Sequence, residues 1–286
     1  MRRKGVLLLA VVTVLVLTTG CLGASPGDAG PEDNETAEGV SGDDGPEASY
    51  EQEEHTGCQP GEVDKNRTCT ATFSGGNADI FGVENLTRIT ATNTSLGGTP
   101  GYLARPADNG SYPSVVMIHE WWGLNENIRH MADVLAANGY TVFAVDLYDG
   151  EVAANSSRAA ELSGRVRNNP DEAVGKLSDA TEALRASPYS NGRVASLGWC
   201  FGGGWSLQLS LSETELNGTV IYYGTLTTNE TELRGIDAPV LGIFGSEDEV
   251  VGIENVREFN DTLDEIGVEK EIRVYEGARH AFANPS

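Results

Sequence analysis

Hydrophobic positions in the second half of the chain follow two alternating patterns. Short segments such as residues 115–118 (Val-Val-Met-Ile) and 240–244 (Val-Leu-Gly-Ile-Phe) are almost entirely apolar, which is typical of strands covered on both faces. Between such segments, apolar residues recur at helical spacing, as in residues 128–135, 174–184 and 253–266, and predict amphipathic helices packed on a core. Strands that alternate with helices predict an α/β fold, a mostly parallel sheet of about eight strands with helices on both faces.

The predicted strands are residues 88–94, 99–105, 114–119, 141–146, 193–198, 219–223, 239–245 and 270–275. In a parallel sheet of this kind, functional side chains gather beyond the carboxyl ends of the strands. The chemistry of the chain is therefore expected in the loops that follow these segments.

The first 21 residues predict an export signal. Three basic residues precede an apolar run of 12 residues, and Thr-Thr-Gly then leads to Cys21. As a helix this run spans about 18 Å, too little for a hydrocarbon core of about 30 Å. The sequence around Cys21 is similar to a lipoprotein cleavage site, at which the Cys is lipidated. We expect membrane contact only through this anchor, on the extracellular face, by Sec or Tat export; the alternatives are simple cleavage and an uncleaved anchor.

Residues 22–64 hold 13 carboxylates and no Lys or Arg, which predicts a disordered acidic tether. Over the whole chain, 43 acidic residues against 19 basic ones give a net charge of −24. Such a charge excludes nucleic acid as a partner and resembles that of proteins from high-salt environments; an ordinary acidic secreted protein is the alternative. Nine Asn-x-Ser/Thr sequences agree with export and suggest glycosylation.

The strongest chemical motif is Gly-Trp-Cys-Phe-Gly-Gly-Gly at residues 198–204. It lies between a predicted strand and an apolar helix and matches the Gly-x-nucleophile-x-Gly elbow, with Cys200 as the nucleophile. The N-terminus of the following helix favours a thiolate. The alternatives are a buried structural Cys and a nucleotide-binding loop, although the latter lacks its Lys-Ser/Thr completion.

Two further residues complete a triad in chain order. Asp248 follows the predicted strand 239–245, with Glu247 and Glu249 beside it, and His280 follows the last predicted strand. Nucleophile, acid and base in this order, each after a strand, are what α/β-hydrolases require. Each residue is weak evidence alone, and together they predict a Cys200–His280–Asp248 triad.

With these motifs, the sequence resembles the dienelactone hydrolase family over roughly residues 85–286. The further matching segments are residues 115–125 (Val-Val-Met-Ile-His-Glu-Trp-Trp-Gly-Leu-Asn), 139–140 (Gly-Tyr), 146–148 (Asp-Leu-Tyr) and 188–192 (Pro-Tyr-Ser-Asn-Gly). The resemblance implies an α/β-hydrolase fold and hydrolysis of an ester or lactone through an acyl-enzyme, without a cofactor. It also implies that Glu120 helps to activate Cys200 and that the backbone N–H groups of Trp121 and Phe201 form the oxyanion hole. From its position alone, Glu120 would be a solvated carboxylate at a strand end.

Two departures from the family concern substrate recognition and the C-terminus. Arg158 lies where the family has an arginine that binds the substrate carboxylate, but Asn284 stands where dienelactone-cleaving members have a second one. We therefore infer the reaction class and not the namesake substrate. The family continues into a C-terminal helix, whereas this sequence ends at Ser286, so we expect that helix to be missing and apolar sheet surface to be exposed.

The remaining cysteines, Cys58 and Cys69, are predicted to form a disulfide in an exported chain, because His55 alone offers too few further ligands for a metal site. The sequence thus predicts a monomeric hydrolase domain at residues 65–286 that acts on a small ester or lactone and needs no metal. The alternatives are a general carboxylesterase or thioesterase, and a surface binding lipoprotein that kept the fold without the activity.

Overall fold

The computed structural model describes residues 88–284, so the predicted signal peptide, the acidic tether and Cys21, Cys58 and Cys69 lie outside the described residues. The strands are β1 (Ile89–Leu96), β2 (Thr99–Pro106), β3 (Tyr112–Ile118), β4 (Thr141–Val145), β5 (Ser190–Trp199), β6 (Gly218–Tyr222), β7 (Val240–Gly245) and β8 (Lys270–Tyr275). The helices are α3 (Glu126–Ala137), α4 (Ser156–Arg167), α5 (Pro170–Arg185), α6 (Phe201–Leu211), α7 (Glu230–Leu233) and α8 (Ile253–Ile266). The predicted α/β-hydrolase fold is confirmed, and every predicted strand is present.

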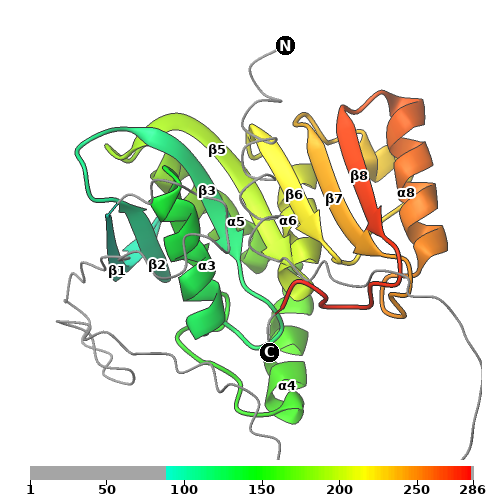
Figure 1. Cartoon of the computed structure of the whole chain (residues 1–286), viewed down its shortest axis with the longest axis horizontal. Coiled ribbons are helices and arrows are strands. Elements are labelled where there is room, and N and C mark those ends of the chain that lie inside the picture. Colours follow the sequence, from blue (N-terminus) through cyan, green and yellow to red (C-terminus); the bar gives the residue numbers. More distant parts are fainter. Residues whose placement is uncertain (1–87, 285–286) are drawn as a thin grey trace, which may run out of the picture.

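The eight strands form one sheet in the order β1-β2-β4-β3-β5-β6-β7-β8. β1 and β2 pair antiparallel, as do β2 and β4, and the other five neighbouring pairs are parallel. The chain runs from β3 outward to β4 and then crosses back to β5, so the strand order reverses beside β3. Such a switch point opens a crevice at the carboxyl ends of the strands, which form the lower edge of the sheet in Figure 1.

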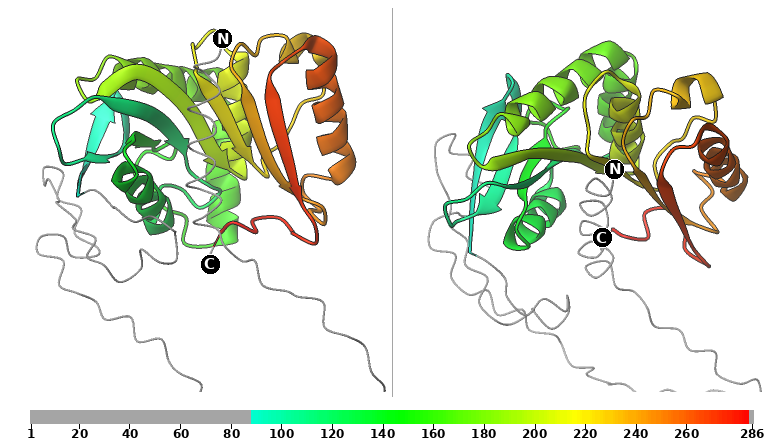
Figure 2. Two further views of the ribbon diagram at one scale, coloured as in Figure 1. Left: turned by 45° about the horizontal axis from the view of Figure 1, so that its top comes forward. Right: turned by 90° about the horizontal axis from the view of Figure 1, so that it is seen from above.

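Both faces of the sheet are covered by helices, which explains the apolar runs in the sequence. Val115 and Met117 belong to a core cluster with α3, while Val116 and Ile118 point the other way into a cluster with α4, α5 and α6. Helix α8 covers the end of the sheet at β7 on that second side. Figure 2 shows α3 on one side of the sheet and α5 and α6 on the other. All four strand residues are fully buried, as the alternation of strand side chains requires.

Local capping sets the ends of several helices. The side chains of Asn125 and Asn155 accept backbone N–H bonds at the starts of α3 and α4, and Pro170 opens α5. Gly267 ends α8 in the left-handed conformation, with φ of 76°. None of the helices in residues 88–284 is long and apolar enough to cross a membrane.

Candidate active site

Cys200 lies at the sharp turn between β5 and α6. Its backbone has φ of 53° and ψ of −114°, an unusual conformation for a residue with a side chain. At Gly198 and Gly202, on either side of the turn, there is no room for a side chain. A Cβ at Gly198 would lie 2.1 Å from the carbonyl oxygen of Gly202, and one at Gly202 would lie 2.2 Å from that of Ile118. The glycines of the elbow therefore let α6 pack closely against β5 and β3 while the Cys200 side chain points out of the turn.

The predicted triad residues meet at the carboxyl edge of the sheet. His280 Nε2 lies 3.2 Å from Cys200 Sγ, and its Nδ1 lies 2.9 Å from Asp248 Oδ2. The other carboxylate oxygen of Asp248 accepts the backbone N–H groups of Val250 and Val251 at 2.8 and 2.9 Å, which holds this buried side chain in place. The structure thus places a thiol, an imidazole and a carboxylate in hydrogen-bonding sequence.

Glu120 is buried beside the thiol. It is 4% exposed, so the solvated position expected from the sequence alone is wrong. Its carboxylate accepts a short hydrogen bond of 2.6 Å from Asn284 Nδ2 and a long one of 3.5 Å from the Tyr223 hydroxyl. Burial raises the pKa of Glu120 to about 7, although both hydrogen bonds act in the opposite direction. At neutral pH the group can therefore give or take a proton.

The thiol of Cys200 is protonated in the resting site. Burial raises its pKa to about 11, and the negative charges of Glu120 and Asp248 act in the same direction. The backbone N–H of Phe201 and the positive charge of Arg167 oppose this rise. A neutral thiol resists oxidation and is a weak nucleophile until a base removes its proton. His280 and Glu120 are the titratable groups that lie beside it.

The segment that carries Glu120 and Trp121 is fixed by His119 and Tyr148. The His119 ring is fully buried, with Nδ1 2.7 Å from the Glu120 carbonyl oxygen and Nε2 3.2 Å from the donating N–H of Leu147. The Tyr148 hydroxyl donates to the Trp121 carbonyl at 3.1 Å. These bonds hold the peptide that bears the Trp121 N–H. The Phe201 N–H lies in the first turn of α6, where backbone N–H groups have no partner within the helix.

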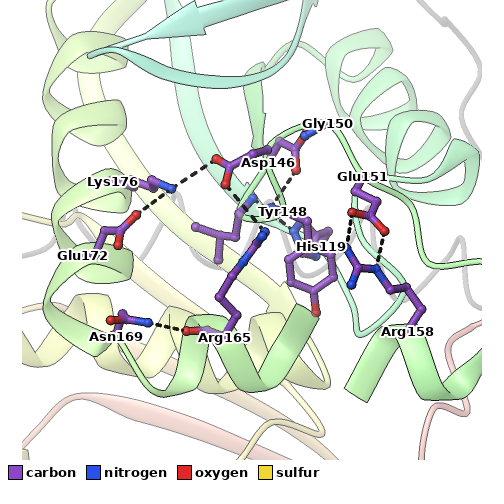
Figure 3. A network of polar contacts seen from close by, with 12 residues as sticks. His119, Asp146, Tyr148, Gly150, Glu151, Arg158, Arg165, Asn169, Glu172 and Lys176 are labelled. Atoms are coloured by element: carbon purple, nitrogen blue, oxygen red, sulfur yellow. Dashed lines mark hydrogen bonds and ion pairs between the residues drawn. The ribbon is translucent and has the colours of Figure 1, made fainter. Parts of the chain in front are cut away.

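The Arg158 guanidinium forms ion pairs with two carboxylates. Its Nε and Nη2 donate to Glu151 at 2.5 and 2.7 Å, and its Nη1 lies 2.5 Å from Glu161. Figure 3 shows the pairing with Glu151. A role for Arg158 in substrate binding stays a prediction, because such a role would require these ion pairs to open.

A cavity of about 130 Å³ lies between α4 and α5, away from the triad. Lys176 lines it and lies 3.2 Å from Asp149 and 3.0 Å from Glu172. Figure 3 shows Lys176 bridging two carboxylates in this way. Arg165, on the same wall, lies 3.6 Å from Asp149. Since these cations are paired with carboxylates, the cavity has no free positive charge for an anionic ligand.

The sequence analysis missed Tyr223. This buried residue follows β6 directly and contacts the His280 ring at 5.2 Å between ring centroids, besides its bond to Glu120. Its position at a strand end was the available signal. Asn284 was noted only as a departure from the family, and its contact with Glu120 depends on the segment after β8. Figure 1 shows this segment, in red, running back along the carboxyl edge of the sheet toward α4.

The profile of the dienelactone hydrolase family matches residues 99–286. The chain belongs to this family. Two similar proteins are Protein usf of Aquifex pyrophilus and a protein of Aquifex aeolicus that is named as a carboxymethylenebutenolidase. Each is 30% identical over 190 residues, which cover 64% of this chain and 81% of the relative.

Solved structures agree with this assignment. The structure of a dienelactone hydrolase-like promiscuous phosphotriesterase from metagenomic libraries matches with a TM-score of 0.64 and 25% identity, over 69% of this chain and 85% of that one. A structure titled m3DLH matches with a TM-score of 0.63 and 26% identity, over 69% and 86%. The chain is therefore an enzyme, a hydrolase of ester or lactone substrates.

Proposed function

We propose that this family member cleaves a carboxylic ester or lactone through a covalent acyl-enzyme on Cys200. The observation that carries the proposal is the position of the His280 ring, with one nitrogen 3.2 Å from Cys200 Sγ and the other 2.9 Å from Asp248. This is the arrangement of a nucleophile, a general base and an acid that orients the base.

The first half of the reaction forms the thioester. His280 Nε2 accepts the thiol proton, assisted by Glu120, and the sulfur attacks the acyl carbon of the substrate. Asp248 stabilises the imidazolium that results. The backbone N–H groups of Trp121 and Phe201 donate to the developing oxyanion, an interaction worth about 3 kcal/mol per donor in comparable sites. His280 then returns its proton to the leaving oxygen, and the alcohol departs.

The second half releases the acid. His280 takes a proton from a water molecule, the resulting hydroxide attacks the thioester carbon, and the thiol is restored when the proton returns to sulfur. A lactone follows the same steps, with the leaving oxygen still attached to the acyl chain. The neutral Asn284 and the occupied Arg158 argue against an anionic lactone, so neutral esters are the first substrates to test.

The test is hydrolysis of short 4-nitrophenyl esters by the full chain in molar salt. We expect Cys200→Ala and Asp248→Asn to lower kcat/KM by about 10⁴-fold, as in comparable triads. Glu249→Gln is the matched control, because this exposed carboxylate is adjacent to Asp248 in the sequence and should be dispensable. Intact-mass analysis after rapid mixing should show one acyl group, on Cys200.

Retained activity in Cys200→Ala would refute the proposed nucleophile. Equal losses in Asp248→Asn and Glu249→Gln would refute the proposed triad. A folded wild-type chain with no activity on any ester or thioester would favour the surface binding lipoprotein instead. We also propose export and lipidation at Cys21, which membrane fractionation and mass analysis of the mature N-terminus would test.

A further inference from the structure

Helix α4 ends beside the two residues whose backbone amides are proposed to form the oxyanion hole. The Arg167 guanidinium lies over the Phe201 ring, with Cζ 5.4 Å from the ring centroid. Its Nη1 also lies 3.4 Å from the Ser163 hydroxyl, which accepts the Trp121 indole N–H at 2.9 Å. One cation therefore contacts the Phe201 side chain directly and the Trp121 side chain through a single hydroxyl.

In the part of the chain that the structure describes, Arg167 has no carboxylate as an ion-pair partner. Two other arginines of α4 are paired, Arg158 with Glu151 and Glu161, and Arg165 with Asp149. Within residues 88–284, no carboxylate forms an ion pair with Arg167, although the whole chain carries a net charge of −24. Among the described residues, the charge of this exposed guanidinium is therefore screened by solvent but not neutralised by an ion pair.

That site must accommodate negative charge twice, first on the Cys200 sulfur and then on the substrate oxygen. Glu120 and Asp248 both oppose this charge, whereas Arg167 favours it. His280 becomes cationic only after it has taken the thiol proton. In the resting enzyme, Arg167 is thus a permanent cation whose charge opposes the effect of the two carboxylates on the sulfur.

We propose that Arg167 is a positioning residue that stabilises the Cys200 thiolate and the oxyanion by its charge, acting across Phe201 without touching the substrate. The part of the proposal that concerns the oxyanion rests on the proposed function. The thiolate part holds for any reaction of Cys200. The attraction passes partly through solvent, so it weakens as added salt shortens the Debye length from about 10 Å at 0.1 M to about 3 Å at 1 M.

The test is alkylation of Cys200 by iodoacetamide, a neutral reagent, as a function of pH in the full chain. The thiolate displaces iodide and forms a carbon–sulfur bond, and peptide mass spectrometry assigns the product to Cys200. We expect Arg167→Met to slow alkylation at pH 8 by about 3- to 10-fold, since the thiolate fraction falls about tenfold for each unit of pKa. Arg167→Lys should restore most of the rate, because it restores the charge.

Arg165→Met is the matched control, two residues away on the same helix and paired with Asp149. It should leave the alkylation profile unchanged. The difference between the wild type and Arg167→Met should shrink from the lowest salt at which circular dichroism shows a folded chain to molar salt. For a neutral ester, Arg167→Met should lower kcat and leave KM unchanged.

The proposal is overturned if Arg167→Met alkylates like the wild type, if Arg165→Met slows equally, or if Arg167→Lys fails to restore the rate. A change confined to KM would also overturn it, because that result would indicate substrate binding. Alkylation needs no turnover, so failure of the proposed hydrolysis and failure of the Arg167 proposal are seen in different assays.

Discussion

Burial of Glu120 should make the protein less stable than its neutral variant above neutral pH. In the unfolded chain Glu120 has its ordinary pKa of 4.5, while in the folded protein the pKa is about 7. Between these values the unfolded state has lost the proton and the folded state keeps it, so folding stability falls as pH rises through this window. At about 1.4 kcal/mol per pH unit, the contribution at pH 8 is a loss of about 3 kcal/mol.

Glu120→Gln removes this titration while it keeps the shape and the acceptor oxygen for Asn284, at the cost of the longer bond from Tyr223 to the other oxygen. We expect the variant to match the wild type in unfolding free energy near pH 4 and to exceed it by about 3 kcal/mol at pH 8, or about 6 to 12 °C in Tm for a domain of this size. The same variant should be a poor enzyme, since it cannot assist removal of the thiol proton. Stability gained with activity lost is the expected signature of a strained functional site.

The assay is urea unfolding followed by circular dichroism at fixed salt, from pH 4 to pH 8. Glu254→Gln is the control, because the Glu254 side chain is 81% exposed on α8 and its removal should not change the pH dependence. Parallel stability curves for the wild type and Glu120→Gln would refute the reasoning. They would mean that the Glu120 carboxylate is solvated or ion-paired in solution.

Three further predictions concern the elbow, the C-terminal segment and the surface. Gly202→Ala should abolish activity and lower soluble yield, because its Cβ would lie 2.2 and 2.6 Å from two backbone oxygens at the end of β3. Gly204→Ala, whose nearest neighbour would be 3.5 Å away, should be tolerated. Asn284→Ala removes a donor to Glu120 and should move the acidic limb of the kcat/KM profile upward by about 1 to 2 pH units. This shift corresponds to about 1.5–3 kcal/mol for a hydrogen bond to a charged group. A stationary limb would contradict this role. If the chain is glycosylated, glycopeptide mapping should find Asn109 occupied, because it is exposed in the turn between β2 and β3; a bare Asn109 beside other occupied asparagines would contradict the prediction.

The grouping of Cys200, Asp248 and His280 could be predicted because its signals are local. Cys200 stands among glycines after a predicted strand, and Asp248 and His280 each follow a strand of their own, so one sheet edge brings them together. The arginines show where this reasoning fails. The family resemblance pointed to Arg158 as a substrate-binding residue, but the structure shows Arg158 paired with carboxylates. Arg167, at the other end of the helix, lies beside Phe201.

By itself, the sequence determined the succession of strands and helices, the glycine-rich turn at Cys200 and the positions of Cys200, Asp248 and His280 after successive strands. These depend on periodicity and on short-range backbone sterics, which a single segment contains. Only the tertiary structure decided that Glu120 is buried with a raised pKa. Its two hydrogen-bond partners, Tyr223 and Asn284, lie 103 and 164 residues away along the chain. Desolvation of Glu120 and compensation of its charge depend on residues that only folding brings around it. The pattern of one segment therefore cannot predict them.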